Sequence, residues 1–340
     1  MCSIGQARAD RQQDFKGDLP FEIIEKVVGE AARHGSYVDL HGGEPLLYKQ
    51  LGDCIALLSK HRMLSYITTD GLKLKRRAAE LVESGLKILL ISLDGWDEES
   101  QKQRGLVPGS FQAIVDGVQE VKRLRGKRAF PIIRIGTVTT KVNYHSLDKI
   151  AQTVYEMGVR RWALAPYFFM TDSAMAAHRL FKLKTGIGDQ VMQHHIPGTE
   201  SYFTHAEVAD LKRSLARLRI LLDGPLRGLR ADVNWEADLD SYYSPKTPSS
   251  NSKCNLPFDR VDIHTDGRIA VCGDGHTIGN MKTGTLTEAW RGEKYRRFRK
   301  TLDEHKVMPM CFRCCGIANT IQFDKQSVEL SKSELVSIGG

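Results

Sequence analysis

The sequence predicts an α/β fold built on a parallel sheet, followed by a small C-terminal segment of a different kind. Through the first two-thirds of the chain, short β-rich runs alternate with segments of helical periodicity. Such alternation is typical of parallel strands joined by right-handed helical crossovers. Beyond about Phe169 the alternation stops, and a hairpin pattern and a group of cysteines follow. Units of this size fit a full barrel, a partial barrel or a doubly wound sheet.

Five runs rich in β-branched and other apolar residues are predicted to form the strands of the sheet. Each is short enough for one strand and is followed by residues typical of a turn. They are residues 37–41, 64–69, 87–93, 132–139 and 161–166.

Helices are predicted before and between these runs. Residues 21–28 form the first, and Ser110 is a plausible N-cap for a helix that begins at Phe111. Another follows the fourth strand, with Gly158 as its C-cap. Later in the chain we expect helices over 207–222 and 286–302 and a linker or surface loop over 242–253. We also expect a hairpin of residues 261–264 and 268–272 around the turn 265–267.

Composition excludes several classes of protein. The chain has 340 residues and a net charge of +8, but its basic clusters at 73–77, 122–128 and 295–300 fall in predicted helices, where charge usually marks a solvated face. No nucleic-acid module accompanies them, so a nucleic-acid partner is not expected. No run reaches the roughly 18–20 apolar residues of a membrane helix, and residues 1–10 lack the apolar core of a signal peptide. We therefore expect a cytoplasmic location and no membrane association.

Five of the seven cysteines lie between Cys254 and Cys315. In a reducing compartment, such cysteines more often bind metal or do chemistry than form disulfides. Cys254, Cys272 and the C-x-x-C pair Cys311 and Cys314 can complete a zinc site or hold an iron–sulfur cluster, and the spacing does not choose between these. Unmetallated thiols are the remaining alternative. Cys315 is a spare neighbour, and Cys54 has the spacing of a small core residue.

Polar and glycine residues follow three of the predicted strands. They are His41-Gly-Gly-Glu-Pro45, Thr69-Asp-Gly71 and Asp94-Gly95. Parallel sheets place their chemistry at the carboxyl ends of strands, so these segments are candidates for a site. Tight strand-to-helix turns are the simpler explanation for any one of them alone.

Taken together, these segments resemble the motifs of the radical S-adenosylmethionine (AdoMet) superfamily. His41-Gly-Gly-Glu-Pro45 is similar to its glycine-rich motif. Ile91-Ser-Leu-Asp-Gly95, with Arg104-Gly105 and Gly109-Ser-Phe111 after it, resembles the region of its fourth strand. Thr139-Thr-Lys-Val-Asn143 resembles the end of its fifth.

The C-terminal pattern is similar to an abbreviated SPASM or twitch-like domain, which carries an auxiliary 4Fe–4S cluster. Its marks are the spacing of Cys254, Gly267 and Cys272, then Ile278-Gly-Asn280, Trp290 and the C-x-x-C pair. The resemblance covers nearly the whole chain and favours iron–sulfur over zinc. It implies a partial (β/α)6 TIM-like barrel over residues 1–240, with its first strand missing, and an auxiliary-cluster domain over 254–325.

The catalytic cluster of this superfamily is held by three cysteines in a C-x-x-x-C-x-x-C motif, and the chain departs from that pattern. Cys2 alone precedes Gly42, at a separation that suits the third cysteine of the motif. We expect that the chain begins inside the motif and that the other two cysteines stand three and seven positions before Cys2. The rival hypothesis is a homologue that has lost its catalytic cluster. An incidental terminal thiol is the third possibility.

The resemblance implies a role for several residues. Cys2 ligates the catalytic cluster, Gly42 and Gly43 let the backbone approach AdoMet, and Glu44 accepts from its ammonium group. Ser92 and Asp94 bind its carboxylate or ribose, and Arg104 pairs with its carboxylate. The simpler alternatives are a helix-capping Glu44 and a surface Arg104.

The function implied is that of a radical SAM enzyme. A 4Fe–4S cluster and AdoMet generate a 5′-deoxyadenosyl radical, which takes hydrogen from a peptide, protein or small-molecule substrate, and a reducing electron donor is required. The alternative is a non-catalytic iron–sulfur or zinc binding module. Auxiliary-cluster ligands Cys254, Cys272, Cys311 and Cys314 leave that cluster without an open position, which favours electron relay or a structural role.

Overall fold

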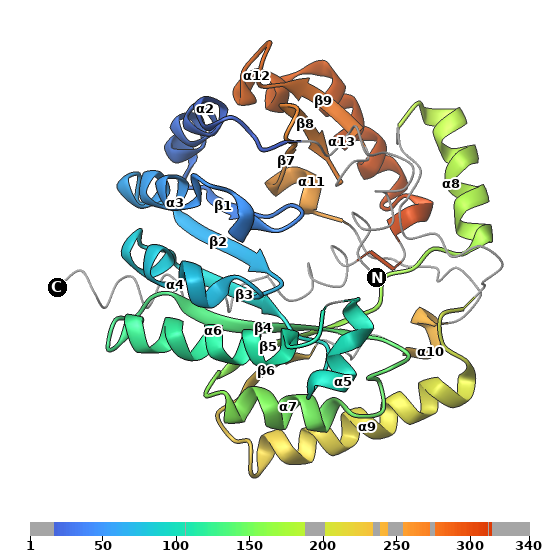
Figure 1. Cartoon of the computed structure of the whole chain (residues 1–340). Helices are drawn as coiled ribbons and strands as arrows, with labels where there is room; N and C mark the ends of the chain where they lie inside the picture. Colours follow the sequence, from blue (N-terminus) through green and yellow to red (C-terminus); the bar gives the residue numbers. More distant parts are fainter. Residues whose placement is uncertain are drawn as a thin grey trace. The chain divides into compact units, whose positions relative to one another are not determined.

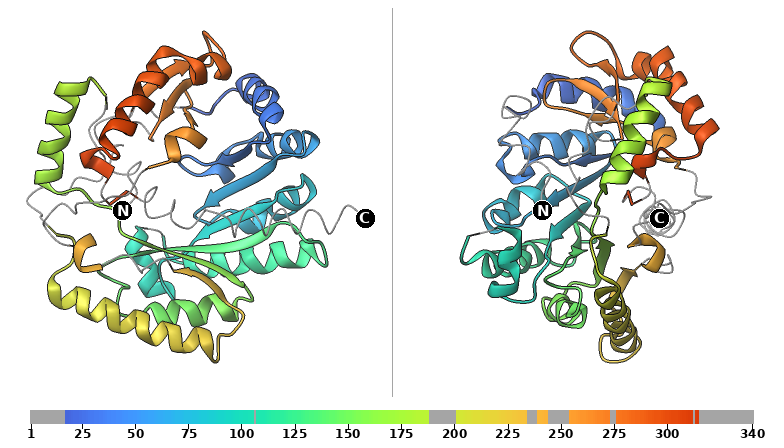
Figure 2. Two further views of the ribbon diagram at one scale, coloured as in Figure 1. Left: turned by 180° about the vertical axis from the view of Figure 1, so that it is seen from behind. Right: turned by 90° about the vertical axis from the view of Figure 1, so that its right-hand side faces the viewer.

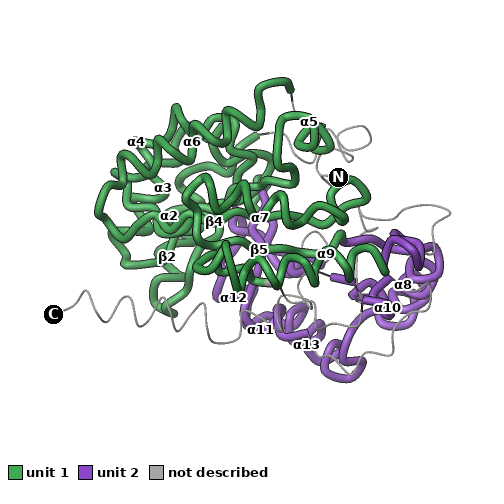
Figure 3. The backbone as a smooth tube through the Cα atoms, turned by 90° about the horizontal axis from the view of Figure 1, so that it is seen from below, with its two compact units in different colours: residues 1–167, 209–233, 265–267 green, residues 168–208, 234–264, 268–340 purple. Residues whose placement is uncertain are grey.

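The computed structural model describes residues 17–105, 107–187, 201–233, 239–243, 254–272, 276–311 and 313–314. The chain divides into two compact units (Figure 3). Unit 1 comprises residues 1–167, 209–233 and 265–267, and unit 2 comprises 168–208, 234–264 and 268–340. These limits differ from the domains expected over 1–240 and 254–325, and those domain limits stay a prediction.

Unit 1 is built on a parallel sheet whose six strands follow one another in chain order (Figure 1). Each strand pairs with the next, so that within the described residues β1 and β6 are edge strands and the sheet is open. The strands are β1 Tyr37–Leu40, β2 Leu64–Thr69, β3 Ile88–Ser92, β4 Ile132–Thr139, β5 Arg161–Pro166 and β6 Arg230–Val233.

Side chains along each central strand alternate between two environments because successive residues of a strand point to opposite faces. On one face, residues such as Ile67, Leu89 and Ile135 are fully buried, and the helices of the unit supply the cover (Figure 2). On the other face, which we call the half-buried face, residues such as Tyr66 and Arg134 stay partly exposed.

The helices of unit 1 come from amphipathic segments that place their apolar sides on the sheet. Leu51, Cys54, Ile55 and Leu58 are the buried side of α3, for example. The elements are α2 Phe21–Ala31, η1 Ala32–His34, η2 Pro45–Leu47, α3 Leu51–Lys60, α4 Leu74–Glu83, α5 Glu98–Gln101, η3 Lys102–Arg104, α6 Ser110–Arg125, α7 Leu147–Glu156 and α9 His205–Asp223, whose first residues belong to unit 2.

The predicted α/β class with an open, partial-barrel arrangement is confirmed, and so are the five predicted strands. The sixth strand was missed because β6 has only four residues, and Arg230 and Asp232 make it polar. Pairing with β5 creates this strand, not local propensity. The expected absence of an earlier barrel strand concerns residues outside the described range, and it stays a prediction.

Two helix boundaries differ from expectation. Gly109, with φ of +88°, occupies the N-cap of α6, and Ser110 is the first helical residue. The helix expected over 286–302 is two helices, because the backbone is extended at Gly292. Gly158 follows α7 with a φ of +74°, as expected for a glycine that ends a helix.

Unit 2 contains a three-stranded antiparallel sheet, which extends the predicted hairpin by one strand. Tyr295 and Phe298 of its longest C-terminal helix are buried. The elements are α8 Asp172–Thr185, α10 Leu239–Tyr242, α11 Leu256–Asp259, β7 Asp262–Ile263, β8 Arg268–Val271, β9 His276–Asn280, α12 Leu286–Arg291, α13 Glu293–His305 and η4 Pro309–Cys311. Across the described parts of both units, no helix combines the length and apolar character needed to span a membrane.

Candidate functional site

Glu44 joins the loops that follow β1 and β2. Its Oε1 accepts hydrogen bonds from Leu46 N at 2.9 Å and from Thr69 Oγ1 at 2.6 Å, and its Oε2 accepts from Asp70 N at 2.8 Å. It is therefore also the N-cap of η2, the simpler role considered from sequence. Burial raises the pKa of the carboxyl group, and these hydrogen bonds oppose the shift. A carboxylate has about four acceptor positions, so about one remains on Oε2 for a further donor.

Gly42 and Gly43 are exposed beside Glu44. Neither has a positive φ, and a Cβ added at either position would meet no atom within 4 Å. The described chain thus supplies no conformational or packing reason for glycine at these positions. The close approach of AdoMet to Gly42 and Gly43, which the resemblance implies, stays a prediction.

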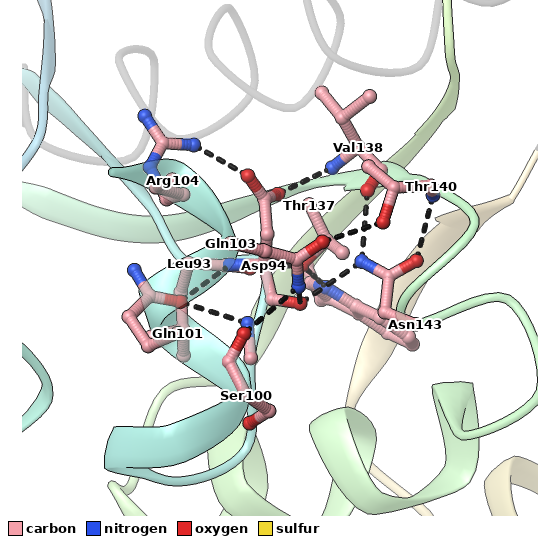
Figure 4. Close-up of polar contacts among 12 residues, drawn as sticks. Leu93, Asp94, Ser100, Gln101, Gln103, Arg104, Thr137, Val138, Thr140 and Asn143 are labelled. Carbon is pink, nitrogen blue, oxygen red and sulfur yellow. Dashed lines mark hydrogen bonds and ion pairs between the residues drawn. The ribbon is translucent and has the colours of Figure 1, made fainter. Parts of the chain in front are cut away.

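Asp94 lies just beyond β3, and its side chain is only 1% exposed. Oδ2 pairs with Nη1 of Arg104 at 2.5 Å, and Oδ1 accepts from Val138 N at 2.7 Å (Figure 4). Burial raises the pKa of the Asp94 carboxyl group, while Arg104 and the Val138 amide act against that rise. Because both oxygens already have partners, the geometry favours Asp94 as a support for Arg104 over a direct ligand contact.

Three amide side chains hold the backbone around Asp94 (Figure 4). Gln101 Oε1 accepts from the amides of Asp94 and Gly95 at 3.0 and 2.8 Å. Gln103 Nε2 and Asn143 Nδ2 both donate to the Asp94 carbonyl, at 2.7 and 2.9 Å. This network ties the carboxyl ends of β3 and β4 together. Sequence reasoning missed Gln101 and Gln103, and their only sequence signal was proximity to the Asp94-Gly95 motif.

Arg104 and Ser92 retain free hydrogen-bonding capacity. Arg104 is 24% exposed and pairs with Asp94 through one nitrogen, while its buried Nε has no partner among the described residues. Ser92, the last residue of β3, lies on the half-buried face, and its hydroxyl makes no hydrogen bond within the described part of the chain. Unit 1 therefore gathers Gly42, Gly43, Glu44, Ser92, Asp94 and Arg104 on the segments that follow β1 and β3 and at the end of β3.

The four predicted C-terminal ligands all lie in unit 2. Cys254 and Cys311 are buried, and Cys272 and Cys314 are partly buried. Burial raises the pKa of the Cys272 thiol far above its usual value, and the nearby Cys311, Cys254 and Cys314 add to the rise. By chemical type, these four thiols are a suitable donor set for iron–sulfur or zinc. Among the described residues, however, no three His, Cys, Asp or Glu side chains already have the spacing of a metal site.

Arg313 anchors the C-x-x-C segment, a role that sequence reasoning missed. Its side chain is buried, and its guanidinium lies 4.4 Å from the ring centroid of Phe169. Arg313 Nε donates to the Tyr242 carbonyl at 2.8 Å, and the Tyr242 hydroxyl donates to the Arg313 carbonyl at 3.1 Å. These reciprocal contacts hold the backbone between Cys311 and Cys314.

The remaining cysteines divide into two kinds. Cys54 is fully buried in α3, as expected for a core residue. Cys2 and Cys315 lie outside the described residues, and the role of Cys2 in the catalytic cluster stays a prediction.

Comparison with known families identifies both parts of the chain. Residues 1–154 match the model of the radical SAM superfamily, and residues 254–315 match the SPASM model, described as an iron–sulfur cluster-binding domain. The second match contains Cys254, Cys272, Cys311 and Cys314.

Individual proteins give matches of varied extent. A probable GTP 3′,8-cyclase of Archaeoglobus fulgidus is 41% identical over 238 residues, which cover 68% of this chain and 67% of that protein. A probable GTP 3′,8-cyclase of Methanosarcina mazei is 36% identical over 99 residues, and the match spans only 28% of this chain and 29% of that protein. The crystal structure of Streptococcus suis SuiB bound to its precursor peptide SuiA has the same fold, with a TM-score of 0.59, 18% identity, and coverage of 88% and 65% of the two chains. The chain described here therefore belongs to the radical SAM superfamily and carries a C-terminal match to its iron–sulfur cluster-binding SPASM domain.

Proposed function

We propose that this protein is a radical SAM enzyme that binds AdoMet at the carboxyl edge of the unit 1 sheet. The observation that carries the proposal is unused hydrogen-bonding capacity at that edge. Glu44 retains an acceptor position, the Ser92 hydroxyl has no partner among the described residues, and Arg104 retains donors after it has paired with Asp94. The resemblance to superfamily motifs points to the same residues.

Each residue has a defined task in this proposal. Glu44 accepts from the ammonium group of AdoMet, and Gly42 and Gly43 leave room for its methionine portion. Arg104 pairs with the carboxylate, held in place by the buried Asp94, and Ser92 donates to the carboxylate or to a ribose hydroxyl. Asp94 is thus a positioning residue in the proposed site.

Two groups of cysteines hold the clusters in the proposed enzyme. Cys2 is a ligand of the catalytic cluster, and Cys254, Cys272, Cys311 and Cys314 hold the auxiliary cluster. When bound, the reduced catalytic cluster and AdoMet supply a 5′-deoxyadenosyl radical that abstracts hydrogen from substrate. Four cysteines would leave the auxiliary cluster without an open position, which favours electron relay or a structural role.

The substrate in this proposal is a peptide, a protein or a small molecule. Relatives carry the name GTP 3′,8-cyclase, while a protein of similar fold is bound to a precursor peptide, so the comparisons support more than one class. A reducing electron donor is a required partner. We still expect a cytoplasmic location, and we do not expect a nucleic-acid partner.

Ser92→Ala is the sharpest test of the AdoMet site. The Ser92 hydroxyl makes no hydrogen bond within the described chain, so the variant should fold as stably as the wild type. We expect AdoMet affinity, measured by equilibrium dialysis after anaerobic reconstitution, to fall by about tenfold. Ser59→Ala in α3 is the matched control and should bind normally. Equal affinity in all three proteins would contradict the assigned site.

Metal analysis tests the auxiliary cluster and separates the enzyme from a binding module. After anaerobic reconstitution we expect about four irons per chain at Cys254, Cys272, Cys311 and Cys314, lost in Cys272→Ala. Zinc in place of iron after anaerobic preparation would favour a structural site. Reductive formation of 5′-deoxyadenosine from AdoMet is measured in the same reconstituted protein. Absence of 5′-deoxyadenosine from the reconstituted protein would favour a non-catalytic module.

A further inference from the structure

Charged residues occupy the half-buried face of the sheet in unit 1. On β4, Arg134 alternates with the buried Ile133 and Ile135, so its side chain points to the face opposite the core. Tyr66 of β2 and Asp232 of β6 lie near it on the same face. The pKa of Tyr66 is raised to about 12 by burial; Arg134 acts against the rise, and Asp39, Tyr37 and Asp232 add to it. Tyr66 therefore keeps its proton, and can donate a hydrogen bond, at neutral pH.

Strand register places three arginines in one row. Ile135 pairs with Trp162, so the preceding residues, Arg134 and Arg161, are neighbours across β4 and β5. Arg161 in turn pairs with Arg230 of β6. Adjacent strands lie about 4.8 Å apart, so these three cations repel one another unless anions lie against the row. The fold has concentrated positive charge on this face.

Asp232 supplies one such anion, and its exposed carboxylate is one that another anion could displace from Arg134. Its carboxylate forms an ion pair with Nη2 of Arg134. The Arg134 side chain is only 12% exposed, whereas that of Asp232, on the edge strand, is 51% exposed. A guanidinium prefers two parallel hydrogen bonds to a carboxylate or phosphate. Here Arg134 Nε is buried and has no partner among the described residues.

The Tyr66 hydroxyl is a second donor without a hydrogen-bond partner in the described chain. Arg134 Nε and Tyr66 therefore offer two unsatisfied donors beside a row of guanidinium groups. An unpaired buried donor such as Arg134 Nε is costly, so a negatively charged group that accepts from Arg134 Nε and also from the Tyr66 hydroxyl would stabilise this face.

We propose that Arg134, Arg161 and Tyr66 bind an anionic group of the substrate, a carboxylate or a phosphate, and that Asp232 occupies this position in the free protein. The inference rests on the proposed enzymatic function, because it concerns the substrate of that enzyme. It predicts that the substrate displaces Asp232 from Arg134 and takes the hydrogen bonds that the described chain leaves open.

Calorimetric titration with sodium tripolyphosphate and sodium citrate, at constant ionic strength and without AdoMet, tests this site. Arg134→Gln should weaken binding about tenfold, and Tyr66→Phe about threefold. Asp232→Asn should tighten binding about threefold, because it removes the competing carboxylate. A gain in affinity cannot come from a folding defect. The matched controls are Arg123→Gln and Asp210→Asn, which alter exposed ion pairs of α6 and α9 and should bind as the wild type does.

Selective binding of tripolyphosphate identifies a phosphate group, and selective binding of citrate identifies a carboxylate. The proposal is overturned if neither probe binds, if Arg134→Gln binds as well as the wild type, or if Asp232→Asn fails to bind more tightly. AdoMet binding and its dependence on Ser92 are measured separately. Failure of the anion site therefore leaves the radical SAM proposal standing, and failure of the Ser92 test leaves the anion measurement interpretable.

Discussion

Two substitutions of Asp94 distinguish its hydrogen bond with Val138 from its ion pair with Arg104. β3 and β4 pair through Ser92 and Gly136, and Leu93 N still donates to the Gly136 carbonyl at 2.9 Å. Beyond that point, the Asp94 carboxylate accepts from Val138 N at 2.7 Å and so continues the pairing where β3 has ended. The second contact is the ion pair with Arg104. Asp94→Ala removes both contacts, whereas Asp94→Asn keeps an oxygen for Val138 and loses only the ion pair.

The two variants should differ in free energy of unfolding. Leaving the Val138 amide without an acceptor costs about 1–3 kcal/mol. Loss of the Arg104 pair costs about 1 kcal/mol or less, because the arginine is 24% exposed and can turn to water. We therefore expect Asp94→Ala to lower the free energy of unfolding by about 1–4 kcal/mol and Asp94→Asn by about 1 kcal/mol or less.

Urea denaturation monitored by the fluorescence of Trp96 and Trp162, both in unit 1, measures these values. Because a chain with two compact units need not unfold in one step, hydrogen exchange of peptides from β4 provides a local measurement. Exchange at Val138 should accelerate in Asp94→Ala and stay protected in Asp94→Asn. Equal destabilisation by the two variants would refute the assignment of the carboxylate as the acceptor for Val138.

Three further predictions concern other parts of the chain. Trp162 is fully buried and donates to Thr137 Oγ1 at 2.8 Å, so Trp162→Phe should lower the free energy of unfolding by about 1–2 kcal/mol. Trp96 is half-buried, so Trp96→Phe should lower it by less, and urea denaturation followed by circular dichroism compares the two variants. Burial raises the pKa of Cys54 from 9.0 to about 12. Iodoacetamide at pH 8 should therefore modify Cys54 only after unfolding, as mapped by mass spectrometry, and labelling at the unfolded rate would disprove its burial. The unfolded chain loses this proton first, so the Cys54 contribution to stability should fall as the pH rises from about 9 to about 12. In unit 2, the Arg299 guanidinium stacks on Tyr295 and Trp290, at 3.7 and 4.4 Å from their ring centroids. Arg299→Ala should therefore lower the free energy of unfolding by about 1–3 kcal/mol, and Arg299→Lys should lower it by less. Trp290 fluorescence follows the unfolding.

Local sequence pattern was sufficient for much of the architecture. Strands β1 to β5 were predicted because apolar β-rich runs and helical periodicity are properties of neighbouring residues. The glycine-rich segment, the Asp94-Gly95 turn and the four C-terminal cysteines were found for a similar reason, since their spacing along the chain is itself the signal. The family comparisons then confirmed the superfamily that these motifs resemble.

Local patterns could not predict hydrogen-bond and ion-pair partners that lie far apart in the sequence. Asn143 contacts the Asp94 carbonyl from 49 residues away, and Arg134 contacts Asp232 from 98 residues away. Sequence alone therefore identified Asp94 and Arg104 as polar residues of a strand-end site, but it offered both as ligand contacts. Their mutual ion pair and the burial of Asp94 changed the proposed role of the aspartate to support.

The sequence by itself thus determined the fold class, the order of the first five strands and the chemical types gathered at the strand ends and in the cysteine group. Tertiary packing decided which of those groups are already satisfied and which remain available. It also created β6, which brings Arg230 into a row with Arg134 and Arg161. The physical reason is that periodicity is set by bonds along the chain, whereas burial, pairing and charge proximity depend on segments that meet only after folding.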